Sequence, residues 1–334
     1  MRAFEYTRAQ TLESAVETLH EHPSAAALGG GTTLVDLMKC GVAGPSLLVD
    51  LTHVSGHDGI EAGASALRVG ALATMSEVAV HPEVRRRWPA VSEALLKGAS
   101  QQLRNMARIG GNLMQRTRCG YFRDPSFAHC NKRDPGSGCA ALEGENRGHA
   151  VLGTSEQCIA MFPGDLPVAL TAFDAVVHIL GPGGPRSVPI EEFYLLPGAT
   201  PWQEHPLERD ELITGVEVPA SAAAAFSHYL KVRDRVSYEF AAASAAVGLA
   251  LAADGTIAEA RVALGGVATK PWREPAVEAA LAGRPAEPEV FRQAAELAAA
   301  GARPREHNGY KVELARRTVA RALTELAAEA GGER

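Results

Sequence analysis

Four of the five cysteines of this chain, Cys119, Cys130, Cys139 and Cys158, lie in one polar segment with the spacing C-x10-C-x8-C-x18-C. The segment is rich in Gly, Pro, Arg and Asn and has neither helical nor strand periodicity, so we expect something other than an apolar core to organise it. Four thiolates are the number that a tetrahedral zinc ion or an iron–sulfur cluster requires. Because the CxxC pairs of zinc ribbons and ferredoxins are absent, the pattern predicts a metal centre without deciding which one.

Other interpretations of these cysteines are weaker. A disulfide framework is uncommon in proteins of the cytoplasm, and buried free thiols normally lie in apolar helices and strands. His129 and His149 lie close to the cysteines in the sequence, but four thiolates leave no coordination position for them. Cys40, in the sequence MKCG, is far from the segment and is interpreted as a small packing residue.

The composition is that of a globular protein, with 334 residues, 46% of them hydrophobic and 22% charged, and a formal net charge of −6. The length predicts two or three domains. Mild acidity argues against a nucleic-acid partner, and no run approaches the roughly 20 apolar residues of a membrane span. The N-terminal residues have no signal-peptide pattern, so we expect a cytoplasmic protein, or a periplasmic one that is exported folded with a signal-bearing partner.

A glycine-rich turn near the N-terminus offers a second kind of chemistry. The run AAALGGG leads into a helix predicted over residues 32–39, and SLLVDL is predicted to be the next strand. Backbone N–H groups at the start of a helix after a glycine turn suit a phosphate. However, GGGTT matches neither GxGxxG nor a Walker loop, so a packing turn is an equal alternative. Before this turn, Thr11 is the predicted N-cap of a helix with the apolar face Leu12, Ala15, Val16 and Leu19.

Two further units follow in the sequence. The second begins near Ile60 and is predicted to contain a strand at 67–72, helices at 75–80 and 88–98, and a polar run that ends in Gly110-Gly111-Asn112. Asp165 directly precedes an apolar helix, which favours either a helix N-cap or a carboxylate that accepts sugar hydroxyls. The third unit starts with an alternating strand and an alanine-rich stretch, a composition that suits helices, and ends in helices predicted at 289–301 and 311–329.

Taken together, five motifs in this order resemble the FAD-binding medium subunits of molybdenum hydroxylases, the group of xanthine dehydrogenase, carbon monoxide dehydrogenase and aldehyde oxidoreductase. The motifs are AAALGGGTTLVDLMK, QLRNMARIGGNL, PGDLPVAL, LKVRDRVSYEF and HNGYKVELARRTVARAL. The cysteine segment resembles an insertion in the flavin subunit of the periplasmic bacterial type of aldehyde oxidoreductase. A comparable insertion in 4-hydroxybenzoyl-CoA reductase holds a [4Fe–4S] cluster.

This resemblance implies an α+β fold of the vanillyl-alcohol oxidase and carbon monoxide dehydrogenase flavoprotein type. The implied units are an α/β unit at 1–58 that binds the FAD pyrophosphate, a second FAD-binding unit at 59–222 with the insertion at about 116–160, and a C-terminal unit at 223–334. The implied FAD-binding residues are Leu28, Gly29, Gly30, Gly31, Thr32, Thr33, Leu34, Arg104, Asn105, Gly110, Gly111, Asn112, Leu113, Asp165 and Lys231.

Several of these positions have specific implied roles. Asp165 would bind ribose or ribityl hydroxyls, and Lys231 would lie near the flavin ring, although a solvated strand edge is an alternative for Lys231 and Arg233. Arg108 stands where the family usually has Thr, so its equivalence to that contact is open. A cation near the flavin would stabilise its anionic reduced form.

By the same resemblance, Cys119, Cys130, Cys139 and Cys158 would ligate one [4Fe–4S] cluster, with a structural zinc site as the main rival. Nearby cations would offset the negative charge of a cluster held by thiolates, or would be ordinary solvated loop charges. These cations are Arg118, Arg123, Lys132, Arg133 and Arg147.

The implied function is that of an electron-transfer subunit that passes electrons from [2Fe–2S] clusters to FAD and an external acceptor. Its expected partners are a large molybdenum-cofactor subunit, where substrate is oxidised, and a small [2Fe–2S] subunit, so no catalytic general base is expected in this chain. One alternative is a flavin-free scaffold or assembly protein with a zinc-held loop. Another is an independent oxidoreductase of the vanillyl-alcohol oxidase type, which the small, alanine-rich C-terminal third disfavours.

Overall fold

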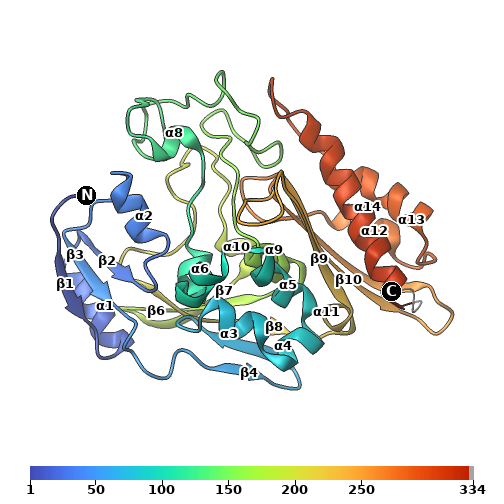
Figure 1. The fold of residues 1–334 in the computed structure, drawn as a ribbon, viewed down its shortest axis with the longest axis horizontal. Helices are drawn as coiled ribbons and strands as arrows, with labels where there is room; N and C mark the ends of the chain where they lie inside the picture. The colour runs from blue at the N-terminus through green and yellow to red at the C-terminus, as the bar shows by residue number, and fades with distance from the viewer. Residues whose placement is uncertain (331–334) are drawn as a thin grey trace.

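The computed structural model describes residues 1–330, which form three sheets with their covering helices (Figure 1). The N-terminal sheet is parallel, in the order β1-β3-β2. Its elements are β1 (Glu5–Arg8), α1 (Leu12–Glu21), β2 (Ala25–Leu28), α2 (Leu34–Lys39) and β3 (Leu47–Asp50). The predicted helix after Thr11 is confirmed as α1, because Thr11 and Ser14 form a reciprocal capping box and the four expected apolar residues are buried.

The second sheet is antiparallel, in the order β4-β5-β8-β6-β7. Its strands are β4 (Ile60–Ala62), β5 (Ala66–Gly70), β6 (Val176–Gly181), β7 (Gly184–Pro189) and β8 (Leu212–Pro219). The helices of this unit are α3 (Met75–Val80), α4 (Pro82–Arg87), α5 (Pro89–Lys97), α6 (Gln101–Met106), α7 (Ile109–Leu113), α9 (Leu166–Ala172) and α10 (Ile190–Phe193). The helices predicted at 75–80 and 88–98 are therefore confirmed.

The third sheet is also antiparallel, in the order β12-β11-β10-β9. Its elements are α11 (Ala222–Ala225), β9 (Ser227–Val232), β10 (Ala243–Leu251), β11 (Ile257–Gly265), β12 (Trp272–Arg273), α12 (Pro275–Leu281), α13 (Pro288–Ala295), the 3-10 helix η1 (Glu296–Ala299) and α14 (Tyr310–Ala330). The alanine-rich stretch forms β10, one of the two inner strands, and most of its residues are buried. The two predicted C-terminal helices are confirmed, because α13 and α14 begin within one residue of the expected positions.

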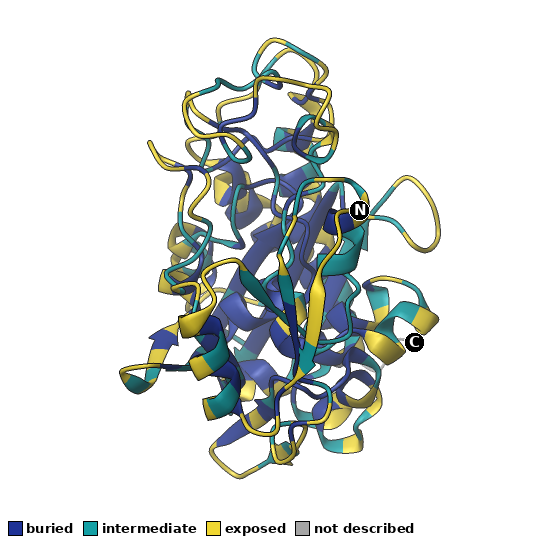
Figure 2. Cartoon of the chain, turned by 90° about the vertical axis from the view of Figure 1, so that its left-hand side faces the viewer, coloured by how far each residue is buried: buried dark blue, intermediate teal, exposed yellow. Residues whose placement is uncertain are grey.

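Apolar side chains form a separate core cluster around each sheet. Figure 2 shows buried residues concentrated in the interior sheets and helices and exposed residues along many loops, whereas β1 is mostly exposed and β2 only partly buried. Each sheet is drawn from one of the three predicted units, although the exact boundaries at 58 and 222 stay predictions. Among the helices of residues 1–330, none combines the length and apolarity that a membrane crossing requires.

The cysteine segment has almost no regular structure, as expected. Between α7 and α9 the described chain contains a single short helix, α8 (Gly120–Arg123), and isolated bridges. This segment lies above α2 in Figure 1 and is held on both sides. Asp36 of α2 accepts from Arg118 and Arg123, and Asn308, just before α14, donates to the carbonyl of Ala150. The insertion therefore ties the N-terminal unit to the C-terminal one.

Candidate functional site

The glycine turn between β2 and α2 packs directly against the segment that joins α6 to α7. A Cβ atom on Gly30 would lie 1.7 Å from the carbonyl oxygen of Met106, so only glycine allows the two loops to approach this closely. Gly31 has φ +72, in the left-handed region that favours glycine. The turn is thus built both as a packing element and as the wall of a cavity.

In the second glycine pair, Gly110 serves packing and Gly111 borders open space. Gly110 donates its N–H to the carbonyl of Ala71, and a Cβ on Gly110 would lie 3.0 Å from the Ala71 Cβ. A Cβ on Gly111 would meet no atom within 4 Å, because Gly111 faces open space. Next to it, the buried Oδ1 of Asn112 has no hydrogen-bond partner, although its amide nitrogen lies 3.4 Å from the Met75 sulfur.

Two cavities meet at the glycine turn. The larger, of about 530 Å³, is lined by Gly29–Leu34, Gly110 and Gly111, and extends to residues 205–213. The smaller, of about 230 Å³ and here named the inner cavity, is lined by Asn112, Asp165 and Lys231 among others. Thr32 and Thr33 line both cavities, so the two form one elongated site with the start of α2 at its middle. This shape, with glycine backbone at the centre, suits a dinucleotide whose phosphates lie between two longer arms.

Not every residue expected in the site lines it. Arg104 donates to the carbonyls of Leu96, Gly98 and Ala99 and so fixes the turn at one wall of the inner cavity. Asn105 accepts from Ser76 outside the cavities. Leu28 and Leu113 also stay outside the two cavities and pack behind them. These four residues support the walls, and the distinction depends on tertiary packing.

Asp165 is the N-cap residue of α9, but its side chain makes no capping hydrogen bond to this helix. Instead the Tyr229 hydroxyl donates to Asp165 Oδ1 at 2.7 Å, and the Lys231 ammonium donates to Oδ2 at 2.8 Å. For Lys231, the alternative of a solvated position at a strand edge is wrong, because its side chain is 1% exposed. Burial raises the pKa of Asp165, and the neighbouring Lys231 opposes that rise. Asp165 and Lys231 therefore form a buried ion pair at the floor of the inner cavity.

Arg108, the departure from the family pattern, lies beside the glycine turn. Its Nη1 donates to the carbonyl of Leu72 at 2.7 Å, and its side chain packs against Gly29. Its Nε is buried without a hydrogen-bond partner, and the residue lines the larger cavity.

Several residues that line the two cavities were not predicted to do so. Arg116 and His205 line the larger cavity, while Arg118, Tyr238 and Phe240 line the inner one. The only local signal was the basic pair in QRTR, directly after the second glycine motif. The aromatic residues lie in the motif LKVRDRVSYEF, but nothing in its local pattern indicates that it reaches the cavity.

The four clustered cysteines come together in space. One small cavity is lined by Cys119, Cys130, Cys139 and Cys158. The backbones of Cys130 and Cys139 also form an isolated antiparallel β-bridge. Within residues 1–330, no group of three or more His, Cys, Asp or Glu side chains is arranged to hold a metal ion as it stands. The donor set itself, four thiols around one space, has the composition that a tetrahedral zinc ion or an iron–sulfur cluster takes.

The environments of these thiols differ. Burial raises the pKa of Cys119 to about 11, and the Nε2 of His149 lies 3.2 Å from its sulfur. A hydrogen bond from the Cys158 thiol lowers the pKa of Cys139. Burial, with the charge of Lys311, lowers the pKa of His149 to about 4, so this imidazole is neutral at pH 7. Cys40 lies outside the group and accepts from Arg123 at 3.3 Å.

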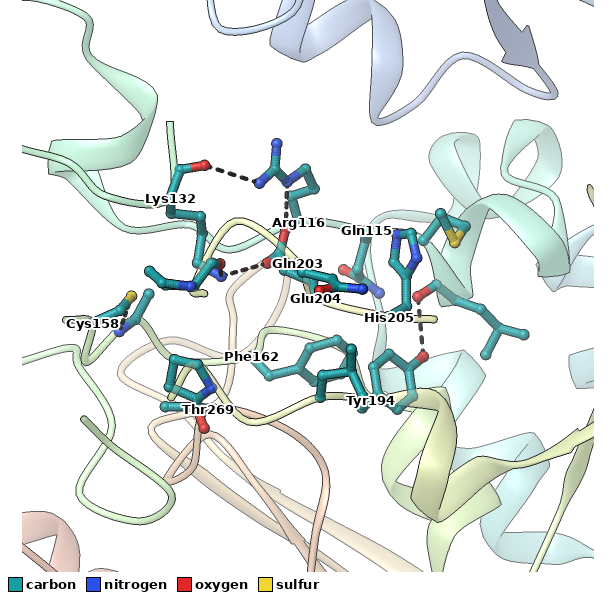
Figure 3. A pocket seen from close by; sticks show the side chains of 16 residues that line it. Gln115, Arg116, Lys132, Cys158, Phe162, Tyr194, Gln203, Glu204, His205 and Thr269 are labelled. Carbon is teal, nitrogen blue, oxygen red and sulfur yellow. Dashed lines mark hydrogen bonds and ion pairs between the residues drawn. The ribbon is translucent and has the colours of Figure 1, made fainter. Parts of the chain in front are cut away.

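Of the five cations near the cysteines, Lys132 lines the cysteine cavity. Its side chain is 9% exposed, so a solvated loop charge is the wrong description for it. Lys132 and Arg116 both donate to Glu204, Lys132 at 3.0 Å (Figure 3). Burial opposes ionisation of Glu204, but these two cations hold its pKa below the usual value. Since Arg116 also lines the larger cavity, the Arg116–Glu204–Lys132 network joins that cavity to the cysteine cavity.

The chain matches two family models, the FAD binding domain in molybdopterin dehydrogenase over residues 2–221 and the CO dehydrogenase flavoprotein C-terminal domain over residues 228–326. It is 45% identical to the aldehyde oxidoreductase FAD-binding subunit PaoB of Escherichia coli strain K12, over 99% of this chain and 100% of that protein. It is 28% identical to the carbon monoxide dehydrogenase medium chain of Hydrogenophaga pseudoflava, over 96% of each chain.

Solved structures agree with these matches. Quinoline 2-oxidoreductase from Pseudomonas putida 86 superposes with a TM-score of 0.76 at 25% identity and covers 100% of this chain and 99% of its own. Carbon monoxide dehydrogenase from Hydrogenophaga pseudoflava gives a TM-score of 0.75 at 28% identity over 98% of each chain. The expected α+β flavoprotein fold is thereby confirmed. The chain belongs to the FAD-binding medium subunits of the molybdenum hydroxylase family, which are subunits of oxidoreductases.

Proposed function

We propose that this chain is the FAD- and [4Fe–4S]-carrying electron-transfer subunit of a molybdenum-containing aldehyde oxidoreductase-type complex. Substrate is oxidised on a large partner subunit, and electrons reach this chain from the [2Fe–2S] clusters of a small subunit and leave to an external acceptor. The observation that carries the proposal is the elongated site centred on the glycine turn, in a chain 45% identical to an aldehyde oxidoreductase FAD-binding subunit. FAD supplies the redox chemistry, and the protein supplies binding, orientation and electrostatics.

Different parts of the elongated site suit different parts of FAD. The backbone of Gly29–Thr33 and Gly111 borders the place where the two cavities meet, which suits the pyrophosphate. The open face of Gly111 and the unpartnered Oδ1 of Asn112 leave both space and an acceptor for a ligand. Asp165 and Lys231 lie in the inner cavity, where a flavin ring would meet a polar floor.

For the cysteines, we propose a [4Fe–4S] cluster whose first role is to organise the insertion. The insertion has little regular structure and contributes few residues to an apolar core, and metal–thiolate bonds can replace a core as the source of folding energy. A second proposed role is exchange of electrons with FAD. A redox titration that places the cluster potential too low for reduction by FADH2 would leave only the structural role.

The decisive experiment is anaerobic purification followed by analysis of iron, sulfide, zinc and flavin. The proposal predicts one FAD together with iron and sulfide in the ratio of a cubane cluster. Cys139→Ser is expected to remove most of the iron, whereas Cys40→Ser, outside the cysteine cavity, keeps it. A colourless protein with one zinc and no flavin would instead support the scaffold alternative. Unchanged iron in Cys139→Ser would refute the ligand assignment.

The partner assignment has its own test. Co-expression with the genes for a large and a small subunit is expected to give a complex that contains molybdenum and [2Fe–2S] clusters. Isolation of this chain alone, without binding to either partner, would contradict it.

A further inference from the structure

Arg118 lies between the inner cavity and the cysteines. It directly precedes Cys119 in the sequence, and it lines the inner cavity together with Thr33, Asn112 and Lys231. It is thus placed to touch a ligand in that cavity from the insertion side.

Two contacts fix the Arg118 guanidinium, and one of its donors has no partner. Its Nη1 donates to Asp36 of α2 at 2.9 Å, and its carbon centre lies 4.9 Å from the centroid of the Phe240 ring. Its Nε is buried and makes no hydrogen bond within the described chain. A buried donor without a partner is costly, so a ligand acceptor in the cavity would remove that cost.

Arg118 does not have a carboxylate to itself. Asp36 also accepts from Arg123, so two guanidinium groups share one carboxylate and leave one net positive charge. In contrast, Lys231, which lines the same cavity, is paired with Asp165. Glu239 also lines the inner cavity, and its Oε2 is buried without a hydrogen-bond partner in the described chain. Arg118 is therefore a cation of the inner cavity whose carboxylate partner, Asp36, does not line that cavity.

We propose that Arg118 is a flavin-positioning residue, through which the cysteine insertion supplies positive charge to the reduced cofactor. This inference rests on the proposed function. Two electrons and one proton convert neutral oxidised flavin to an anionic reduced form, and a fixed cation nearby stabilises the added negative charge. Arg118 thereby raises the flavin reduction potential and strengthens FAD binding.

The test compares Arg118→Gln, Arg118→Lys and Arg123→Gln in the full chain with bound FAD. The flavin reduction potential is measured by spectroscopic redox titration, and the FAD dissociation constant and iron content are measured in parallel. In Arg118→Gln we expect a more negative potential and roughly tenfold weaker FAD binding. In Arg118→Lys we expect a flavin reduction potential close to the wild-type value, because lysine keeps the positive charge. Arg123→Gln is the matched control, since Arg123 shares Asp36 but does not line the inner cavity.

Each further outcome has a defined meaning. A wild-type potential in Arg118→Gln, or an equal shift in Arg123→Gln, would overturn the role of Arg118 while leaving the proposed function intact. A wild-type chain that lacks FAD would instead refute the proposed function. Should Arg118→Gln fail to fold, Phe240→Leu removes the ring under the guanidinium, and a smaller shift in the same direction is expected. No shift in that variant would count against the proposal.

Discussion

At the scale of single residues, Gly30 matters first for packing. Because its Cβ would overlap the Met106 carbonyl, Gly30→Ala must push the two loops apart. We expect a loss of roughly 3 kcal/mol or more in the free energy of unfolding of the FAD-free protein, measured by urea denaturation. Gly111→Ala is the control, because its Cβ enters open space and should alter FAD binding while sparing the stability of that form. Equal stability of the two variants would contradict this explanation.

Asp165 and Lys231 form the second prediction at this scale. Asp165→Asn leaves the buried Lys231 ammonium without its counter-charge and should lower the free energy of unfolding by about 3–5 kcal/mol. The double variant Asp165→Asn, Lys231→Met removes both charges and should recover much of that loss. Urea denaturation of the four proteins in the resulting double-mutant cycle measures the coupling. Simple additivity of the two single effects would show that Asp165 and Lys231 do not stabilise each other.

At the scale of elements, the Arg116–Glu204–Lys132 network attaches the insertion to the loop before β8 (Figure 3). Glu204→Gln leaves two cations facing a neutral amide. Because 24% of the Glu204 side chain is exposed, we expect a loss of about 2 kcal/mol, less than for a fully buried pair. The exposed Glu192→Gln serves as the control.

This network also predicts a pH dependence. The pKa of Glu204 is lowered in the folded chain, so its contribution to stability is fully present above the unfolded value of about 4.3. It is lost as the pH falls through the lower folded value. Melting temperatures between pH 3 and about pH 6 should therefore decrease more steeply in the wild type than in Glu204→Gln. Parallel curves would show that Glu204 is not responsible.

At the scale of the whole molecule, Lys311 of α14 joins the C-terminal unit to the insertion. This side chain is buried, with 1% exposure, and its ammonium donates to the carbonyls of Gly266 at 2.6 Å and Gly148 at 3.2 Å. Burial lowers the pKa of Lys311 to about 8. The buried ammonium of Lys311 thus depends on carbonyl groups from both the insertion and the C-terminal unit.

The sign of the resulting pH effect follows from linkage. Between the folded value of about 8 and the unfolded value of about 10.4, the unfolded chain binds more protons at Lys311, so stability rises with pH over that interval, by roughly 3 kcal/mol. Lys311→Met should reduce this slope in urea denaturation at several pH values. Lys39→Met, at an exposed position, should retain it. A slope that Lys311→Met leaves unchanged would assign the effect to other groups.

Helices that show one apolar face to a sheet were predictable from sequence. The periodicity after Thr11 and at residues 75–80 and 311–329 corresponds to α1, α3 and α14, because one helical face packs on a sheet and the other meets solvent. The alanine-rich strand β10 was not identifiable as a strand. It packs between α14 and the helices α9 and α11, so it lacks the alternation that marks a half-buried strand.

The sequence alone determined the residue types that carry the chemistry: glycine turns at two helix starts and four thiols in a segment without a core. These are local features, since backbone freedom and thiol chemistry belong to the residues themselves. Only the tertiary structure decided that Asp165 pairs with Lys231, that Glu204 joins Arg116 to Lys132, and that Arg118 reaches the inner cavity. Those contacts join segments far apart along the chain, and they form when the three sheets and the insertion pack together, which no local periodicity encodes.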